Sequence, residues 1–330
     1  MSAPPAESRP ATSTDVAKLA GLSRATVSRI LNGDHDGFPE STRERVREAA
    51  RTLRYRPSPA GRSLVSGRSD TIVVLLPNTT FGSNLQDAVD EVAQRTRPLG
   101  GNVVVRFASP SAEATVDALE ALRPLAVVNF GVLADDALLT LRGHGVIVVP
   151  DRPRPGASGI DGGVAALQAS RLADRGFTHL TFGALRDERQ DPYGVGRFTA
   201  LSAWCEAKGM EPPGLVEVPL TLEGGRRALE QLLAGGGPVG VVCYNDDVAV
   251  SLLAAARDLH VAVPEQVGVV GVDHTPTGQL WLPRLTTVHV DFHGLVDDLA
   301  QALEAQVTGR PADQSTPVTD FLSLVPGETA

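Results

Sequence analysis

The hydrophobic pattern of the chain changes near residue 70. Before this point, apolar residues recur every three or four positions, as they do along amphipathic helices. After it, short uninterrupted apolar runs such as TIVVLLP (71–77) alternate with longer helical patterns. Such alternation is typical of buried parallel strands covered by helices. The pattern therefore predicts a small helical N-terminal part and a large α/β part.

The N-terminal part opens with a helix start signal. Thr12 is predicted to be an N-cap, and Asp15 is placed three residues later to complete a capping box. Gly21 is predicted to end this helix and to allow a tight turn. The expected apolar face of the helix consists of Val16, Leu19 and Ala20.

Two more helices are predicted after that turn. Ser23 is a suitable cap for the second helix, and the segment ESTRERVREAARTLRYRP (40–57) predicts a third that stops at Pro57. The apolar stripes are Val27, Ile30 and Leu31 on the second helix, and Val46, Ala49, Ala50 and Leu53 on the third. Two short helices joined by about three residues predict a helix-turn-helix.

The second helix has a polar face that suits DNA. Arg24, Ala25, Ser28 and Arg29 are expected to point away from its apolar side. Arg pairs bidentately with guanine, and Ala contacts the thymine methyl group. Ser23 and Thr26 are short donors suited to phosphate oxygens. The alternative is a three-helix interaction module whose arginines are merely solvated.

From residue 71 onward the pattern predicts two doubly wound parallel-sheet subdomains, because about 250 residues of alternation exceed one sheet of this kind. Ligands in such folds bind beyond the carboxyl ends of the strands. Polar residues follow several predicted strands, namely Asp151, Asn245-Asp246-Asp247 and Asp273. Taken singly, such residues are commonly turn or helix-cap residues; together they indicate a binding cleft.

Charge divides the chain at the same place as the hydrophobic pattern. Residues 1–69 carry 12 Lys and Arg against 7 Asp and Glu, a net charge of +5, whereas the remainder carries −14. A basic head on an acidic body favours a polyanionic partner for the head alone, although a solvated basic face would have the same charge.

Motifs for catalysis and cofactors are missing from the sequence. It has no GxGxxG after the first predicted strand, no phosphate-binding GxxxxGK[ST] and no Gly-x-Ser-x-Gly, and its seven His are scattered. We therefore expect neither an enzyme nor a cofactor or metal site. No apolar run reaches membrane-span length, the N-terminus lacks a signal-peptide core, and two cysteines without a pairing pattern suit the cytoplasm.

Two segments of the head, TSTDVAKLAGLSRATVSRILNG (12–33) and TRERVREAARTLRYRPSPAGRSLVSGRS (42–69), resemble the lactose-repressor (LacI) family of bacterial transcription regulators. The resemblance implies that Arg24, Ala25 and Arg29 choose bases and that Asn32 holds the DNA backbone. It also implies a hinge that folds into a helix on operator DNA and inserts Leu64 into the minor groove. The implied hinge contacts with DNA are Arg62, Ser63 and Leu64.

This head departs from the family pattern in two places. Gly61 stands where the family usually has Ala, which costs roughly 1 kcal/mol inside a helix. Phe38-Pro39 replaces the usual Val-Ser, and the loop before it looks one residue longer. Residues 58–66 also have the composition of a Pro/Gly/Ser linker between two domains, and both interpretations can hold because such a linker can become ordered on binding.

The acidic body resembles the effector domain of the same family, which has the periplasmic-binding-protein fold. Matching segments include GVIVVPDRPRPG (145–156), ASRLADRGFTHLTFGA (169–184) and LPRLTTVHVD (282–291). The resemblance implies a small effector, commonly a sugar, bound by Asp161, Arg197, Asn245 and Asp273, with Asp151 and Phe81 at looser positions. Val290 departs from the polar residue usual there. Tyr193 and Trp281 suit either stacking on a sugar ring or core packing.

The sequence thus predicts a repressor whose operator affinity is controlled by a small effector, most simply a sugar. We expect a homodimer on a pseudo-palindromic operator, without a C-terminal coiled coil. The alternatives are a constitutive DNA-binding regulator and one that senses a non-sugar metabolite such as a nucleoside. The predicted parts are a disordered tail (1–11), a helix-turn-helix domain (12–57), a hinge (58–69) and an effector domain (70–330). The predicted subdomains comprise about 70–160 with 291–316, and about 161–290 with 317–326.

Overall fold

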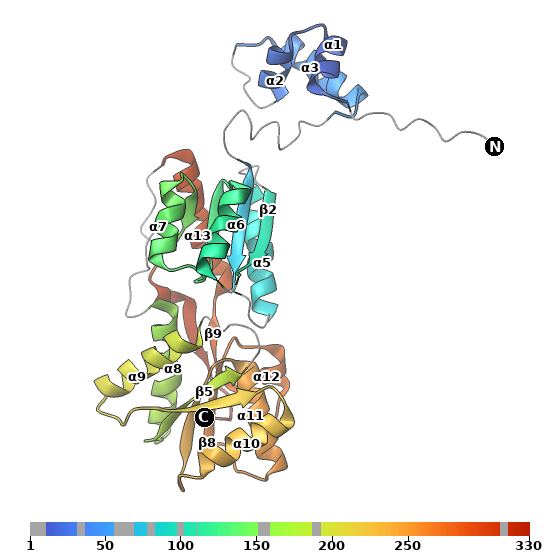
Figure 1. Cartoon of the computed structure of the whole chain (residues 1–330). Coiled ribbons are helices and arrows are strands. Elements are labelled where there is room, and N and C mark those ends of the chain that lie inside the picture. The colour runs from blue at the N-terminus through green and yellow to red at the C-terminus, as the bar shows by residue number, and fades with distance from the viewer. Residues whose placement is uncertain are drawn as a thin grey trace, which may run out of the picture. The chain divides into compact units, whose positions relative to one another are not determined.

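A computed structural model describes residues 11–31, 37–55, 69–77, 83–97, 102–109, 111–150, 159–186, 193–310 and 316–330. The chain forms two compact units, Met1–Asp70 and Thr71–Ala330. Figure 1 shows the helical character of the first unit and the α/β character of the second. Nearly all of the expected tail and hinge lies outside the described residues.

The first unit consists of three short helices around one small core. They are α1 (Ser13–Ala20), α2 (Arg24–Leu31) and α3 (Glu40–Thr52). The capping box is confirmed, since the Thr12 side chain accepts a hydrogen bond from the Asp15 backbone and the Asp15 carboxylate accepts one from the Thr12 backbone. Gly21 ends α1 in the left-handed conformation, with φ of 64°, as the turn requires.

The core of this unit is built from small and β-branched side chains. Its buried members are Val16, Ala17, Ala20, Val27, Ile30, Val46, Ala49 and Ala50. The prediction for Leu19 was wrong, because its side chain is 53% exposed and Ala17 is buried instead. The small side chains of Ala17 and Ala20 let α1 approach α2 and α3 closely. The buried face of α1 therefore contains Ala17 rather than Leu19.

The second unit contains a four-stranded parallel sheet in the order β2-β1-β3-β4. Its strands are β1 (Thr71–Leu76), β2 (Asn102–Phe107), β3 (Ala126–Asn129) and β4 (Ile147–Val149). Associated helices are α5 (Ser83–Thr96), α6 (Ala112–Leu122), α7 (Asp135–Gly143) and α13 (Phe292–Thr308). Although α13 comes much later in the sequence, its residues Val296, Leu299 and Leu303 pack with Ile72 and Val74 of β1.

A six-stranded sheet follows, in the order β10-β9-β8-β7-β5-β6. Its strands are β5 (Leu180–Arg186), β6 (Gly214–Pro219), β7 (Val239–Cys243), β8 (Val267–Val272), β9 (Thr286–Val290) and β10 (Leu322–Val325). Its helices are α8 (Gly159–Asp174), α9 (Gly194–Ala207), α10 (Leu222–Leu233), α11 (Asp246–Asp258) and α12 (Pro276–Leu280). Strand β10 pairs antiparallel with β9, so this sheet is not parallel throughout.

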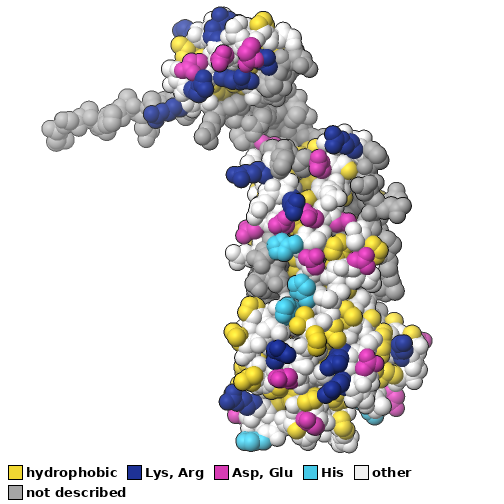
Figure 2. All heavy atoms as spheres, turned by 180° about the vertical axis from the view of Figure 1, so that it is seen from behind, with side chains coloured by type: hydrophobic (Ala, Val, Ile, Leu, Met, Phe, Trp, Pro, Cys, Tyr) yellow, Lys and Arg dark blue, Asp and Glu magenta, His cyan; other side chains and the backbone are white. Residues whose placement is uncertain are grey.

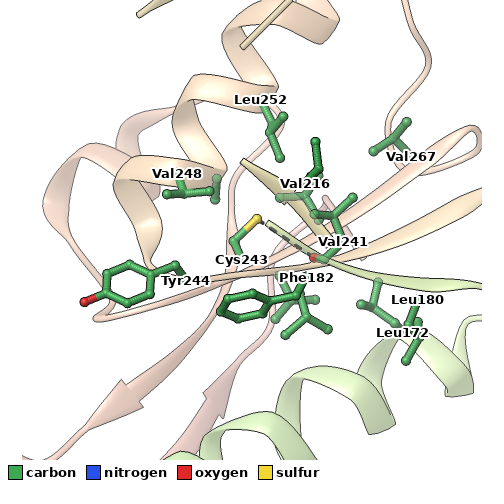
Figure 3. Packing of buried hydrophobic residues seen from close by; sticks show 14 of the residues in the cluster. Leu172, Leu180, Phe182, Val216, Val241, Cys243, Tyr244, Val248, Leu252 and Val267 are labelled. Atoms are coloured by element: carbon green, nitrogen blue, oxygen red, sulfur yellow. Dashed lines mark hydrogen bonds between the residues drawn. The ribbon is translucent and has the colours of Figure 1, made fainter. Parts of the chain in front are cut away.

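Buried strands explain the uninterrupted apolar runs. Every residue of β7 and β8 is buried, and Figure 3 shows Phe182, Val241 and Cys243 packed between strands and helices of the larger sheet. Burial of a large apolar side chain on either face of a sheet stabilises the folded state by roughly 1.5–3 kcal/mol. Such strands therefore lack the alternation that marks a half-exposed sheet.

The helical N-terminal unit and the α/β unit with its two sheets confirm the predicted fold class. The bounds predicted for the subdomains stay a prediction. The hydrophobic pattern missed helices α7, α12 and α13 and strands β9 and β10. Within the described part of the chain, every helix is too short or too polar to cross a membrane.

Candidate functional site

Helix α2 presents the polar face that the sequence predicts. Its buried residues, Val27 and Ile30, face the three-helix core, while Arg24, Ala25 and Arg29 are exposed. This face exposes hydrogen-bond donors and a methyl group, which are the groups that contact base edges in the major groove.

The start of α2 is fixed by local hydrogen bonds. The Ser23 hydroxyl accepts a hydrogen bond from the Thr26 backbone N–H at 3.0 Å, and the two hydroxyls lie 2.8 Å apart. Ser23 is exposed, and Thr26 and Ser28 are half-buried. The hydroxyls of Ser23 and Thr26 thus lie together at the N-terminus of α2, a position where backbone N–H groups also favour phosphate.

Arg29 has an aromatic neighbour from outside its helix. The centre of its guanidinium lies 4.9 Å from the centroid of the Phe38 ring. Phe38 itself is half-buried and packs against the core of the N-terminal unit. In the sequence, Phe38 stands out only as a departure in the loop, so this contact was missed. Figure 2 shows Lys and Arg side chains among acidic ones on one face of this unit.

Several predicted site residues lie outside the described residues. They are Asn32, Arg62, Ser63, Leu64, Phe81 and Asp151.

In the α/β unit, Arg197 is the centre of a cluster from four elements. Its Nε lies 3.3 Å from Oδ1 of Asp161 on α8, and its Nη1 donates to the carbonyl oxygen of Tyr244 after β7. The guanidinium lies 5.5 Å from the Tyr193 ring centroid and 4.9 Å from that of Tyr244. Only 12% of the Arg197 side chain and 28% of the Asp161 side chain are exposed.

Electrostatic interactions keep the buried Arg197 side chain positively charged. Burial lowers the pKa of Arg197, but electrostatic interactions with Asp273, Tyr244 and Asp161 outweigh this effect, so that its pKa is raised overall. Asp273 follows β8, and its φ of 104° is unusual for a residue other than glycine. Burial raises the pKa of Asp273 to about 7, and Arg197 opposes that rise. Arg197, Asp161 and Asp273 therefore belong to one electrostatic group.

Tyr193 connects the two sheets of the unit. Its hydroxyl donates to the Phe130 carbonyl after β3 at 2.9 Å, and its ring faces Arg197. Tyr193 thus combines a polar contact to the smaller sheet with an aromatic contact to the cluster. The Arg197 guanidinium therefore already contacts the Tyr193 ring, for which stacking on a sugar was one of two predicted roles.

Asn245 and Trp281 have structural contacts of their own. Asn245 caps α11, with its Oδ1 accepting from the Val248 backbone N–H at 3.0 Å. Trp281 ends α12 and packs against the core of the larger sheet, and its buried indole N–H has no hydrogen-bond partner among the described residues. No described contact joins Trp281 to Arg197. Groups of three or more candidate metal ligands do not occur in the part of the chain that the structure describes.

Asp246 is the polar residue whose role the sequence did not reveal. Its fully buried carboxylate accepts hydrogen bonds from the Thr275 N–H at 2.6 Å, the Thr275 hydroxyl at 3.0 Å and the Thr287 hydroxyl at 2.6 Å. Asp246 therefore ties the start of α11 to the loop that carries Asp273 and to β9. Its position in a run of three polar residues was the available signal.

Comparison with known proteins agrees with both parts of this description. A model of "Bacterial regulatory proteins, lacI family" matches residues 12–58, and one of a "Periplasmic binding protein-like domain" matches residues 169–330. The HTH-type transcriptional regulator GntR of Pseudomonas aeruginosa is 30% identical, over 92% of this chain and 91% of the relative. The HTH-type transcriptional repressor PurR of Erwinia tasmaniensis is 28% identical, over 93% of each chain.

Solved structures share the whole fold. A lac repressor dimer bound to operator and an anti-inducer aligns with a TM-score of 0.75 at 23% identity, over 97% of this chain and 99% of that one. A complex of the transcriptional regulator CelR with cellobiose aligns with a TM-score of 0.61 at 25% identity, over 97% and 100%. The matched head, the effector-type domain and the near full-length relatives together show that this chain belongs to the LacI family of bacterial transcriptional regulators.

Proposed function

We propose that the chain is a homodimeric repressor whose affinity for operator DNA is set by a small neutral effector, most simply a sugar. The observation that carries the proposal is the Arg197 cluster, because it brings Asp161 and Asp273 to a buried guanidinium in the effector-type domain. In the head, α2 is the DNA-reading helix. Such a regulator would act in the cytoplasm, where operator DNA is found.

The DNA contacts divide by chemistry. Arg24, Ala25 and Arg29 are exposed on α2 and supply base readout, whereas Ser23 and Thr26 supply phosphate contacts at its start. Ser28 lies on the same helix at its half-buried edge. The family resemblance adds Asn32 and the hinge residues Arg62, Ser63 and Leu64.

The charge balance of the effector cluster favours an uncharged ligand. One guanidinium pairs with Asp161 and interacts electrostatically with Asp273, and the buried Asp246 lies close enough to raise the pKa of Asp273. Among the described residues of the cluster, no cation is left over to neutralise a phosphate or a carboxylate on the ligand. Hydroxyl groups both donate and accept, so they match carboxylates, the Asn245 amide and Arg197.

The names of relatives support a carbohydrate. The sucrose operon repressor of Streptococcus mutans is 26% identical over 96% of this chain, and the CelR structure contains cellobiose. A nucleoside is the competing effector class, since it also carries hydroxyl groups and no net charge. The looser pocket positions, Asp151 and Phe81, and the stacking roles of Tyr193 and Trp281 belong to the same proposal.

Strand β2 supports dimer formation. It is the edge strand of the smaller sheet, and Val104, Val105 and Phe107 on it are 41%, 38% and 47% exposed. Large apolar side chains exposed on an edge strand favour association. A second copy of the chain would cover them and would bring two heads to two half-sites. Effector binding would then change the spacing of the heads, with a coupling of typically 1–3 kcal/mol.

The test is a thermal-shift screen of the full chain against sugars, sugar phosphates and nucleosides. A ligand present at 100 times its dissociation constant stabilises the folded state by about 2.7 kcal/mol. We expect a neutral sugar to raise the melting temperature of the wild type but not of the Arg197→Ala variant. Arg186→Ala is the matched control, because Arg186 is exposed and pairs with Glu217 at the edge of the larger sheet.

Operator binding is measured with and without the stabilising compound. Loss or gain of DNA binding on addition of the compound supports effector control. Stabilisation only by sugar phosphates would refute the neutral ligand, and an Arg197→Ala variant that still responds would refute the assigned site. Stabilisation by nucleosides alone would replace the sugar with the competing effector class.

A further inference from the structure

Phe38 lies beneath the guanidinium of a residue assigned to base readout. The distance of 4.9 Å from the Arg29 guanidinium to the Phe38 ring centroid is within the range of a cation–π contact. Arg29 belongs to the last turn of α2, whereas Phe38 precedes α3. The contact therefore joins the DNA-reading helix to a different element of the head.

The Phe38 side chain also contacts the core of the head. Phe38 packs against the buried core formed by all three helices, and Pro39, the residue after it, is the N-cap of α3 with φ of −56°. Proline restricts its own φ and also the conformation of the residue before it. Phe38 is thus a fixed platform rather than a flexible surface side chain.

We propose that Phe38 is a positioning residue for sequence-specific DNA binding, acting by holding Arg29 ready to contact a base. This inference rests on the proposed function, since it takes Arg29 to be a base-reading residue. A free arginine loses rotamer freedom when its guanidinium is fixed. A stacked guanidinium has lost part of that freedom before DNA arrives, so less is lost on binding.

Stacking and base reading use different parts of the guanidinium. The ring contacts one face of the planar group, while hydrogen bonds to guanine are made by N–H groups in its plane. Both contacts can therefore exist at once. Bound DNA excludes water around the contact, which strengthens a cation–π interaction beyond its value at an exposed site.

The experiment compares Phe38→Leu with Phe38→Trp in the full chain. Leucine keeps an apolar side chain against the core but has no π face, whereas tryptophan keeps the face. The DNA is first selected by the wild type from duplexes with a randomised segment of about 20 base pairs, two helical turns. Affinities are then measured for the selected duplex and for a scrambled duplex of the same composition.

We expect Phe38→Leu to weaken binding of the selected duplex by about two- to fivefold per head, because the unstacked arginine then loses more rotamer freedom on binding. Binding of the scrambled duplex, which depends on phosphate contacts, is expected to stay unchanged. Phe38→Trp should bind the selected duplex as the wild type does. In an Arg29→Ala background, Phe38→Leu should have no further effect, because the residue through which Phe38 acts is gone.

The outcomes separate this inference from the proposed function. If the wild type enriches no sequence, the proposed function fails and the role of Phe38 fails with it. If the wild type selects a sequence that Phe38→Leu binds equally well, only the role of Phe38 is overturned. Equal losses on both duplexes, or an equal loss in the Arg29→Ala background, would also overturn it, because they indicate a general effect on the folded head.

Discussion

The buried carboxylate of Asp246 makes the stability of the α/β unit depend on pH. Burial raises the pKa of Asp246 to about 6 from an ordinary value of 3.8, although hydrogen bonds from Thr287 and Thr275 lower it. A shift of roughly 2 units corresponds to about 3 kcal/mol. Because the folded state binds this proton more tightly than the unfolded state, the contribution to stability is complete below about pH 4. It is lost as the pH rises through about 6.

The substitution Asp246→Asn removes this titration and keeps the size of the side chain. Its amide oxygen can still accept from Thr287, but its NH2 group cannot accept from the Thr275 N–H, and one buried donor left unpaired costs about 1–3 kcal/mol. We therefore expect the variant to be less stable than the wild type by about 1–3 kcal/mol near pH 4. Between pH 4 and pH 7.5 the wild type should lose about 3 kcal/mol of stability that the variant does not lose. At pH 7.5 the variant should therefore be as stable as the wild type, or more stable.

Urea unfolding at a series of pH values, followed by tryptophan fluorescence, measures this difference. Both tryptophans of the chain, Trp204 and Trp281, lie in the α/β unit, so the signal does not report on the head. Asp174→Asn is the matched control, since Asp174 is an exposed aspartate at the end of α8. A difference between wild type and Asp246→Asn that stays constant from pH 4 to pH 7.5 would refute the reasoning.

Three further substitutions test contacts elsewhere in the molecule. Gly271→Ala should lower the free energy of unfolding by about 1–3 kcal/mol in urea, because its Cβ would overlap the Asp246 carboxylate; an unchanged midpoint would contradict this. Thr12→Ala should cost the head about 1 kcal/mol by removing the N-cap of α1, seen as earlier loss of helical circular dichroism, with Thr14→Ala as the exposed control. Tyr193→Phe should cost about 0.5–1.5 kcal/mol by removing the bond to the Phe130 carbonyl, and a variant as stable as the wild type would show that this bond contributes nothing.

The sequence predicted those elements that carry their signal locally. The capping box of Thr12, the turn at Gly21 and the fully apolar strands β7 and β8 each follow from a few neighbouring residues. Helix α13 and strand β10 did not follow, because they join sheets whose other strands lie far away in the sequence. Leu19 was misplaced because a period of three or four residues allows two adjacent faces on a short helix, and packing against α2 and α3 selects between them.

The site residues divide in the same way. Arg29 was predicted from its outward place on the second helix and from the family resemblance, whereas Arg197 was predicted from the resemblance alone. The aromatic rings beside them were not predicted as their partners, since Phe38 stood out only as a departure in the loop and Tyr193 suited either a sugar ring or the core. The tertiary structure brings Phe38 to Arg29, whereas Tyr193 caps the helix of Arg197 and lies one turn before it.

A common arrangement links the head and the effector cluster. In each, a long cationic side chain has its guanidinium against one or more aromatic rings, Phe38 for Arg29, and Tyr193 and Tyr244 for Arg197. An aromatic contact restricts a cation without neutralising it. A carboxylate would also restrict an arginine, but it would compete with a guanine or a hydroxyl group for the same N–H donors. An aromatic platform is therefore the better support wherever those donors must reach a ligand. By this argument, replacing Phe38 with Glu should reduce operator affinity more than Phe38→Leu does, and a Phe38→Glu variant that binds as tightly as Phe38→Leu would contradict it.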